Sequence, residues 1–273
     1  MPKFAAIQME PQLLKPKNNL QKVIRKMREA AGAGAHVAVF PECALTGYAI
    51  TAQEAEESAE FIPGPSTERI EDACRDTGLI TAIGLIERDK DGGIYNSAVL
   101  IGPEGFLGKY RKTHLPYLGV DRFLQQGDFL SGPFKTPQGR FGLLICYDLR
   151  FPEPSRVLAL GGAQVILLST AWPSAASLYP DHVAQTRAAE NSLYLVAANR
   201  IGEERGTQYL GRSVITGPDG ELLAEGSSDS EQIITAEIDP QISDQKKRVF
   251  TAGEYELDLF ADRRADLYSP LVH

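Results

Sequence analysis

The sequence predicts an α/β protein in which a mixed β-sheet is covered by outer helices. Apolar runs typical of strands alternate along the chain with segments whose apolar residues have helical spacing. Glycine-rich or Pro-Asp-Gly turns join some pairs of strand-like runs into hairpins, so the sheet should be mixed. No linker, low-complexity segment or short repeat divides the chain. We therefore expect one domain over residues 1–273, with a C-terminal arm from about 253 to 273.

The first half of the chain begins with a strand-like run at Lys3–Met9. Asn18 or Asn19 is expected to cap the next helix, whose apolar residues recur at helical spacing until Gly32 and Gly34 end the pattern. The other expected elements of this half are a strand at His36–Glu42, a helix from about Ser66 to Gly78, a hairpin of Leu79–Asp89 with Ile94–Gly102, and a long loop from Lys109 to about Gly132.

The second half alternates strands and helices more regularly. The run RFGLLICYD reads as a strand, and the helix after it has a proline near its first turn, where no N–H is needed. Val165–Thr170 is almost continuously apolar, as expected of a strand buried on both faces. The remaining expected elements are helices at Pro152–Ala163 and Asp181–Leu193, a strand at Tyr194–Gly202, a hairpin at Ser213–Gly226, and a last strand at Gln232–Asp239.

Composition and charge narrow the possible classes of function. Of the 273 residues, 43% are hydrophobic and 23% charged, and the net charge is −8. This acidic balance argues against a surface that neutralises nucleic-acid phosphates and against a polybasic membrane-binding surface. No segment approaches the ~20 unbroken apolar residues of a membrane span, and the N-terminus has no signal-peptide pattern. We therefore expect a cytoplasmic protein that binds neither nucleic acid nor membranes.

The cysteines are few and are not arranged for cross-linking or metal binding. There are three, Cys43, Cys74 and Cys146, and an odd, sparse set does not make a disulfide framework. No Cys/His cluster has zinc-binding spacing, so no metal site is expected.

Three reactive side chains stand beside strand-like runs: Glu42, Lys112 and Cys146. Each has an ordinary alternative, namely a carboxylate that caps or faces water, a lysine in a solvated loop, and a cysteine packed in the core. Ligands of open α/β sheets collect at the carboxyl ends of strands, so the three could converge there. Together they would supply the base, the cation and the nucleophile for hydrolysis through a covalent intermediate.

Five segments, in order along the chain, resemble the nitrilase or carbon–nitrogen hydrolase superfamily: PECALTGY, KYRKTHL, CYDLRFPE, STAWP and RAAENSLYLVAANR. The resemblance covers most of the chain and implies a four-layer α–β–β–α sandwich. It also implies a catalytic triad at Glu42, Lys112 and Cys146, and no cofactor. It further implies at least a homodimer, in which helices on one face pair and the C-terminal arm lies on the neighbouring subunit.

Further residues are expected around this triad. Many members carry a second glutamate after the lysine, whereas this sequence offers Asp121 as the supporting carboxylate. The backbone N–H of Tyr147, at a strand-to-helix turn, is the expected second donor to an oxyanion. Tyr48 should line the entrance and Trp172 one wall of the pocket, with core packing as the alternative for Trp172. We expect a salt-bridged frame around the nucleophile from Asp148, Arg150 and Glu153, with Arg187, Glu190 and Asn199 as further framing residues.

Histidine is not needed by such a site, although a Cys–His hydrolase would require one beside Cys146. The four histidines are His36, His114, His182 and His273. His114 is the best-placed rival and His182 the second, but each is more readily structural or exposed.

The residues after the expected nucleophile favour amide hydrolysis. Members that cleave nitriles usually have tryptophan and glutamate there, whereas this chain has Tyr147 and Asp148, a pattern similar to amidase-like branches. We expect an amidase that cleaves a small linear amide through a thioester and releases ammonia. The alternatives are a nitrilase, an N-carbamoyl amidohydrolase, a glutaminase subunit that supplies ammonia to a synthetase, and a non-catalytic scaffold of the same fold. The mouth should be formed by loops Ile50–Phe61, Thr113–Leu130 and Ala171–Pro180, whose few basic residues favour a neutral amide.

Overall fold

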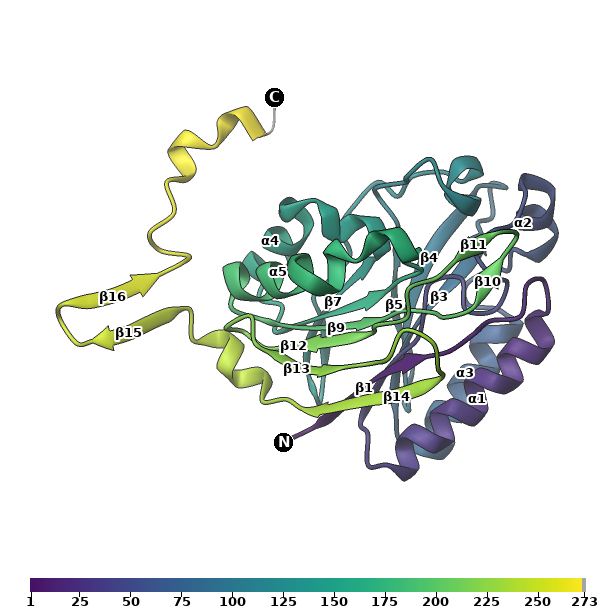
Figure 1. Cartoon of the computed structure of the whole chain (residues 1–273), viewed down its shortest axis with the longest axis horizontal. Helices are drawn as coiled ribbons and strands as arrows, with labels where there is room; N and C mark the ends of the chain where they lie inside the picture. The colour runs from purple at the N-terminus through teal and green to yellow at the C-terminus, as the bar shows by residue number, and fades with distance from the viewer. Residues whose placement is uncertain (272–273) are drawn as a thin grey trace.

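Two β-sheets pack face to face, and helices cover the outer face of each, in this computed structural model (Figure 1). The structure describes residues 1–271, so the end of the expected arm, including His273, lies outside the described residues. Helices α1 (Pro16–Gly32) and α3 (Pro65–Thr77) pack on one sheet, and α4 (Pro152–Leu160) and α5 (Ala184–Asn191) pack on the other. The expected α–β–β–α sandwich is confirmed.

The first sheet has six strands in the order β14-β1-β2-β3-β4-β5. Strands β1, β2 and β3 are parallel to one another. β14 pairs antiparallel with β1, β4 pairs antiparallel with β3, and β5 pairs antiparallel with β4. The long connections through α1 and α3 are those that parallel neighbours require. The strands are β1 (Lys3–Gln8), β2 (Val37–Val39), β3 (Ile80–Arg88), β4 (Ile94–Gly102), β5 (Gly105–Arg111) and β14 (Gln232–Glu237).

The second sheet also has six strands, in the order β13-β12-β9-β8-β7-β6. Its central strands β7, β8 and β9 are parallel, so their carboxyl ends meet at one edge of the sheet. The strands are β6 (Phe134–Thr136), β7 (Gly139–Ile145), β8 (Val165–Ser169), β9 (Tyr194–Ala198), β12 (Val214–Thr216) and β13 (Leu222–Glu225).

The smaller elements lie in the connections and in the C-terminal segment. Helix α2 (Ala52–Ser58) lies beside β3, and a π-helical turn η4 (Tyr179–Val183) lies beside α5. The short ladders are β10 (Glu203–Glu204) with β11 (Thr207–Gln208) and β15 (Lys247–Thr251) with β16 (Tyr255–Asp258). The 3-10 helices are η1 (Gly119–Phe123), η2 (Cys146–Arg150), η3 (Ser174–Ala176), η5 (Pro240–Asp244), η6 (Ala265–Leu267) and η7 (Ser269–Leu271).

The main hydrophobic core lies between the two sheets. Phe4 of β1 and Phe141 of β7 are fully buried there, with ring centroids 5.6 Å apart. Strands β8 and β9 are buried at every position, as their continuous apolar runs predict. Polar side chains on the inner face therefore need partners within the protein, and the strand ends are where such groups occur.

Three local expectations require correction. Helix α1 begins at Pro16, and Asn19 is no cap but a buried tether whose Nδ2 donates to the Leu45 carbonyl at 2.7 Å. The expected loop from Lys109 is wrong at its start, because β5 pairs with β4 as far as Arg111. The local pattern of β5 is weak, and cross-strand pairing decides its conformation. Helix α2 was not predicted within the loop Ile50–Phe61.

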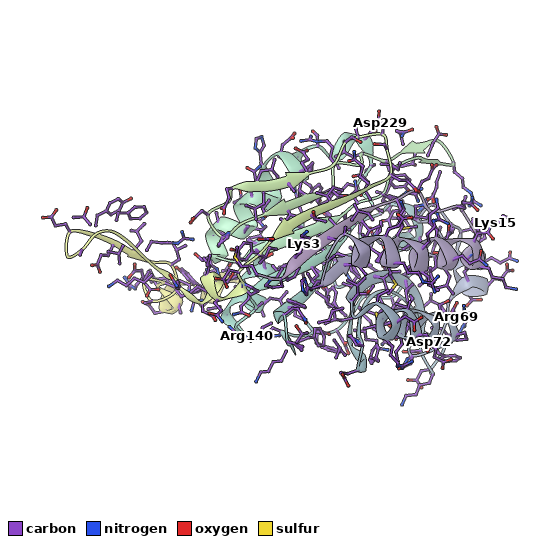
Figure 2. All side chains as sticks on the ribbon, turned by 90° about the horizontal axis from the view of Figure 1, so that it is seen from below. Lys3, Lys15, Arg69, Asp72, Arg140 and Asp229 are labelled. Carbon is purple, nitrogen blue, oxygen red and sulfur yellow. The ribbon has the colours of Figure 1, made fainter. Side chains whose placement is uncertain are left out.

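The C-terminal segment leaves the sandwich and extends from it in both views (Figures 1 and 2). It begins with the β15–β16 hairpin, earlier than the expected residue 253. At its attachment the ring of Phe260 lies 4.8 Å from the Lys246 ammonium and 5.1 Å from the Arg156 guanidinium. Exposed apolar side chains along it are Val249, Phe250, Tyr255, Leu257, Leu267 and Tyr268.

Charged residues lie mostly at the periphery. The labelled side chains Lys15, Arg69 and Asp72 lie on the side of the molecule that α1 and α3 form (Figure 2). Across residues 1–271, none of the helices has the combination of length and apolar character needed to cross a membrane.

Candidate active site

Glu42 lies in the segment that follows β2 and is held against strand β3. The Ala44 N–H donates to the Gly84 carbonyl at 2.9 Å, and the Gly84 N–H donates to the Pro41 carbonyl at 3.2 Å. Gly84 permits this approach, because a Cβ there would lie 2.6 Å from the Cα of Glu42. The absence of one side chain on β3 thus sets the position of the carboxylate.

Lys112 follows directly after β5. Its N–H donates to the Asn96 carbonyl at 2.8 Å, which continues the β4–β5 ladder by one step. Opposed residues of antiparallel strands point to the same face, so the side chains of Lys112 and Asn96 both enter the space between the sheets. Both are buried, with 0% and 1% exposure.

Cys146 stands at the junction between β7 and the 3-10 helix η2, and its φ is +45°. A residue with a side chain rarely adopts this left-handed conformation, and such strain is found where a function requires it. Asp148 stabilises the turn, because its Oδ2 accepts hydrogen bonds from the Ile145 N–H at 3.0 Å and the Tyr110 hydroxyl at 2.8 Å. The thiol lies close enough to Glu42 and Lys112 for both charges to shift its pKa, Glu42 upward and Lys112 downward.

The Lys112 ammonium joins two carboxylates. It donates to Oε1 of Glu42 at 2.6 Å and to Oδ2 of Asp121 at 2.5 Å, with the charged groups of Lys112 and Glu42 fully buried. An ammonium has three N–H donors, so one remains for another acceptor. Asp121, the carboxylate that the sequence offers in place of a second glutamate, thus contacts Lys112 directly.

Asn96 completes this cluster, and the sequence analysis missed it. Its Nδ2 donates to Oε1 of Glu42 at 2.7 Å and to Oδ1 of Asp121 at 2.8 Å. The signal was a polar Asn-Ser pair inside the otherwise apolar strand IYNSAVLIG. Gly84 was also missed, and a lone glycine in ITAIGLIER was the only clue to it.

The surroundings of Cys146 favour its protonated thiol over the thiolate. Burial raises its pKa well above the ordinary value, and the charge of Glu42 raises it further. Lys112 lowers this pKa, but less than burial and Glu42 raise it. The cation alone therefore does not produce a thiolate, and a base must remove the proton during attack.

Glu42 has the properties of that base. Burial raises the pKa of its carboxyl, attraction to Lys112 lowers it, and repulsion from Asp121 raises it again, so that the net direction is upward. Burial alone would lower the pKa of Lys112, but Asp121 and Glu42 together raise it well above its usual range. The site therefore holds a permanent cation beside a carboxylate that can exchange protons nearer neutrality.

Tyr48 and Trp172 are buried, which changes the role expected for Tyr48. Its side chain is 2% exposed, and its hydroxyl donates to Oδ2 of Asp121 at 2.7 Å, so it holds that carboxylate instead of lining an open entrance. Trp172 is fully buried and stacks on Tyr179 with ring centroids 5.1 Å apart. For Trp172 the alternative of core packing is the better description.

The expected frame around Cys146 is only partly as predicted. Asp148 belongs to it, but within residues 1–271 neither Arg150 nor Glu153 forms a salt bridge, and both are exposed. Arg187 does frame the turn, because its guanidinium donates to the carbonyls of Leu149 and Arg150 at 3.1 Å. Glu190 forms a salt bridge with Arg187 at 3.1 Å, and Oδ1 of Asn199 accepts from the backbone N–H of Trp172 at 2.8 Å.

Tyr147 lies where the oxyanion donor was expected, at the start of the 3-10 helix η2. The first N–H groups of a helix have no partner within it. The position is therefore suitable for a backbone donor beside Cys146.

The three histidines within residues 1–271 make structural contacts. His114 contacts Asp148 through Nδ1 at 2.8 Å and stacks on Phe151 with centroids 4.1 Å apart. The Nδ1 of His36 lies 3.1 Å from the Lys3 backbone nitrogen, which donates to it. His182 lies in η4, and its carbonyl accepts from the Thr186 hydroxyl at 2.8 Å.

Two of the three loops expected at the mouth are neighbours. The Val120 N–H donates to the Tyr48 carbonyl at 2.9 Å, and α2 lies beside the 3-10 helix at Gly119–Phe123. The third loop starts at Ala171, directly after the strand next to β7.

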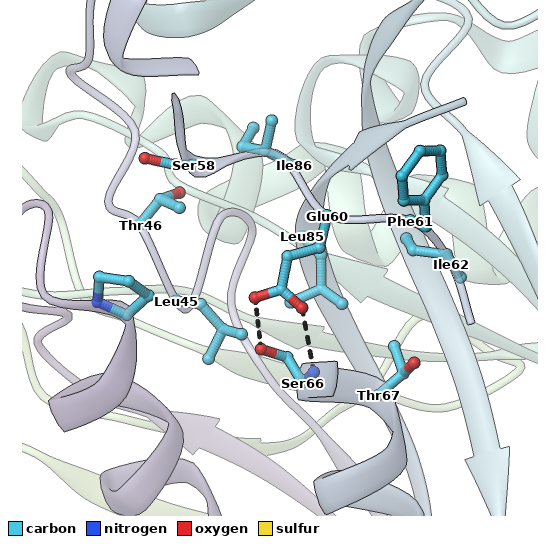
Figure 3. Close-up of a pocket in the computed structure, with 11 residues that line it drawn as sticks. Leu45, Thr46, Ser58, Glu60, Phe61, Ile62, Ser66, Thr67, Leu85 and Ile86 are labelled. Carbon is cyan, nitrogen blue, oxygen red and sulfur yellow. Dashed lines mark hydrogen bonds between the residues drawn. The ribbon is translucent and has the colours of Figure 1, made fainter. Parts of the chain in front are cut away.

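The pocket shown in Figure 3 is separate from this site. Its walls include Leu45, Ile62 and Leu85 and none of the three expected catalytic residues. Glu60 accepts there from the N–H of Ser66 at 3.0 Å and from its hydroxyl at 2.7 Å, at the first turn of α3. This is a helix-terminus contact. Across residues 1–271 no group of three or more His, Cys, Asp and Glu side chains could hold a metal ion.

A buried carboxylate, ammonium and thiol at the strand ends of two packed sheets define a nitrilase-type sandwich as the class of this fold and site. The chain belongs to the carbon–nitrogen hydrolase family, which it matches over residues 3–248. The resemblance inferred from the five sequence segments is thus confirmed.

Relatives of known name cover almost the whole chain. It is 41% identical over 271 residues to a nitrilase of Pyrococcus abyssi, covering 98% of this chain and 99% of the relative. It is 30% identical over 282 residues to omega-amidase NIT2 of Homo sapiens, covering 98% and 96%. Among solved structures, a double mutant of the amidase from Nesterenkonia sp. AN1 in complex with acrylamide has a TM-score of 0.84 at 25% identity, covering 99% of this chain and 97% of that one.

Proposed function

We propose that this protein is an amidase that hydrolyses a small linear amide through a thioester on Cys146 and releases ammonia. Glu42 is the general base and acid, Lys112 and the Tyr147 N–H stabilise the oxyanion, and Asp121 supports Lys112. The observation that carries the proposal is the pair of buried contacts that Lys112 makes with Glu42 and Asp121, at 2.6 and 2.5 Å.

The first half of the reaction forms the thioester. Sulfur of Cys146 attacks the amide carbon while its proton passes to Glu42, and the carbonyl electron pair moves to oxygen. The third N–H of Lys112 and the Tyr147 N–H donate to that oxyanion. Glu42 then gives the proton to the nitrogen, the C–N bond breaks, and ammonia leaves.

The second half regenerates the enzyme. The oxygen of a water molecule attacks the thioester carbon while Glu42 takes a proton from that water. A second oxyanion forms in the same place as the first. The intermediate collapses with cleavage of the C–S bond, and the sulfur regains a proton from Glu42. One amide and one water are thereby converted to one carboxylic acid and one ammonia.

Amide cleavage is favoured over nitrile cleavage by two lines of support. Two relatives are called amidases: omega-amidase NIT2 of Homo sapiens, and the Nesterenkonia protein, whose double mutant was solved with acrylamide. The Tyr147-Asp148 pair after the nucleophile also resembles the amidase-like branches. The few cations around the mouth loops support a neutral substrate, and no particular amide is singled out.

Nitrile hydrolysis is the second candidate, because the 41% identical Pyrococcus abyssi relative is called a nitrilase. Its first covalent step would use the same thiol and the same cation. The two candidates therefore differ in substrate and share the residues named above.

Ammonia release from matched panels of aliphatic amides and nitriles tests the proposal. We expect turnover of one or more amides by the wild-type protein and none by Cys146→Ala. Intact mass spectrometry of the wild-type protein, acid-quenched during turnover of the active amide, should show an acyl adduct on Cys146. Turnover of nitriles alone would replace the amidase by a nitrilase, and no adduct on Cys146 would remove the covalent mechanism.

We also propose that the chain forms at least a homodimer. Supporting this are the large apolar side chains of the projecting segment, such as Phe250, 62% exposed, and Leu267, 60% exposed, which a monomer would leave in water. Light scattering at micromolar concentration should give at least twice the 29.8 kDa chain mass, and a monomer mass would refute it.

A further inference from the structure

We propose that Asn96 is a positioning residue: its side-chain amide fixes Glu42 and Asp121 so that Oε2 of Glu42 is the oxygen that exchanges protons with Cys146. This inference rests on the proposed amidase function and deepens it. Asn96 does not touch the reacting atoms and acts through the two carboxylates.

The geometry is a closed ring of hydrogen bonds. Nδ2 of Asn96 has two hydrogens. It donates one to Oε1 of Glu42 at 2.7 Å and the other to Oδ1 of Asp121 at 2.8 Å. Lys112 bridges the same two carboxylates from the other side, at 2.6 and 2.5 Å. Each carboxylate therefore accepts two hydrogen bonds from the ring, both at Oε1 for Glu42 and one at each oxygen for Asp121, and rotation of either carboxylate would break a contact.

One carboxylate oxygen takes no part in this ring of hydrogen bonds. Oε1 of Glu42 accepts two hydrogen bonds, and both oxygens of Asp121 are occupied, Oδ2 also by the Tyr48 hydroxyl at 2.7 Å. Of these four carboxylate oxygens, only Oε2 of Glu42 is buried without a partner among residues 1–271. An oxygen that the protein leaves unpaired can accept the thiol proton without first giving up a bond.

Packing does not explain an asparagine at this position. Its own Oδ1 is buried and has no partner among the described residues, which is a cost to folding. The neighbouring residues on the same face of β4, Ala98 and Leu100, are apolar, and a similar side chain would avoid that cost. The two donors of the amide are what an apolar residue could not supply.

The amide also limits the net charge of the cluster. The titratable groups around Glu42 are Lys112, Asp121, the Cys43 and Cys146 thiols and the Tyr48 phenol. Two carboxylates share one ammonium, and a neutral donor between them stabilises both without adding charge. The hydrogen bond from Asn96 lowers the pKa of Glu42, against the larger effect of burial.

The test compares Asn96→Leu and Asn96→Ser with Ser97→Ala. Leucine keeps the volume and removes both donors, and serine is a smaller change should leucine prevent folding. Ser97 is the matched control, because it is also buried in β4 and donates to a buried glutamate, Glu87, at 2.5 Å on the opposite face. Circular dichroism and thermal melting establish which variants fold.

The first readout is the pH dependence of amide hydrolysis. The Asn96 variants should lose about 10²-fold in kcat with KM changed little, because the base is misplaced and the substrate is not. The acid limb of the profile should move to higher pH by about one unit, since a charge-stabilising hydrogen bond is lost. The Ser97→Ala profile should coincide with that of the wild type.

The second readout needs no substrate. Iodoacetamide forms a C–S bond with Cys146, iodide leaves, and the thiol proton passes to Glu42, so its rate reports the same proton transfer. The acid limb of this rate should also move up in the Asn96 variants. If the wild type hydrolyses no amide, the proposed function fails, and alkylation still decides the role of Asn96.

A positioning role is refuted if folded Asn96→Leu or Asn96→Ser keeps the wild-type pH profiles with kcat within about threefold of Ser97→Ala. A rise in KM alone, with unchanged profiles, would instead place Asn96 in substrate binding and also overturn the proposal.

Discussion

Lys112 donates to only one oxygen of Glu42: Nζ lies 2.6 Å from Oε1, while Oε2 is buried without a hydrogen-bond partner among residues 1–271. One side of the carboxylate is therefore bound to the cation, and the other is free for proton transfer. This division lets a single glutamate be oriented by Lys112 and still act as a base. The predictions below test its consequences.

Cys146 should be the only cysteine that reacts in the folded protein. It is 8% exposed, whereas Cys43 and Cys74 are both 0% exposed. Iodoacetamide at neutral pH, followed by intact and peptide mass spectrometry, should show one modification, on Cys146. Cys146→Ala should remain unmodified until it is denatured, and equal labelling of Cys43 or Cys74 would contradict the burial described here.

Activity should be lost on the acid side at a pH above the ordinary glutamate pKa of about 4.3. Burial raises the pKa of Glu42, and the base acts only when deprotonated, so activity is present above this raised pKa and disappears as the pH falls through it. The pKa of Lys112 is raised well above its usual range, so Lys112 should add no basic limb below about pH 10.

The pH profile of kcat/KM measures this limb. Glu42→Gln should abolish most of the activity, and its residual rate should lack the acid limb. A limb at or below about pH 4.3 in the wild type would show that Glu42 is not the titrating base.

Replacing Lys112 by methionine should affect both stability and activity. The change leaves Glu42 and Asp121 as buried carboxylates without a counter-charge, which should lower the free energy of unfolding by about 3–5 kcal/mol. Loss of the oxyanion donor should reduce kcat by about 10²–10³ or more. Urea unfolding and ammonia release measure the two effects.

A double variant separates these effects. Lys112→Met with Asp121→Asn has one buried carboxylate fewer and should regain part of the stability without regaining activity. Recovery of activity would mean that Lys112 serves the fold and not the reaction.

Gly84→Ala should impair the enzyme although Gly84 has no side chain in the site. The added Cβ would lie 2.6 Å from the Cα of Glu42, so the segment that carries the base must shift. A displacement of about 1 Å can cost roughly 10²-fold in rate. Gly32→Ala is the matched control, because nothing lies within 4 Å of its added Cβ. In steady-state kinetics, kcat of Gly84→Ala should be lower than kcat of Gly32→Ala by roughly tenfold or more. Equal rates would show that the close approach is unimportant.

Much of the fold could be predicted from local patterns. The strands β8 and β9 were recognisable because they are continuously apolar, and α3 because its helical spacing ends at Gly78, which has a φ of +74°. Strand β5 and the projecting hairpin β15–β16 were not predicted, because their local patterns are weak and they form by pairing with a neighbour.

The site likewise combines residues that the sequence identified with contacts that only the folded structure shows. Glu42, Lys112 and Cys146 were found because reactive side chains after apolar strands, in segments resembling one family, are visible in one dimension. Their spacing in the sequence does not show how far apart they lie in the folded protein. The contacts of 2.6 and 2.5 Å that Lys112 makes exist only once β2, β5 and η1 are packed together.

The sequence by itself determined the alternation of strands and helices, the family, and the three reactive side chains, because each depends on residues close together in the chain. The tertiary structure alone decided which groups surround them. Asn96, Tyr48 and Gly84 reach the cluster through strand pairing and the close approach of distant backbone, and burial there shifts the pKa values of Glu42 and Cys146. Hydrogen-bond geometry and desolvation depend on the three-dimensional arrangement of residues that are distant in the sequence, so no local pattern predicts them.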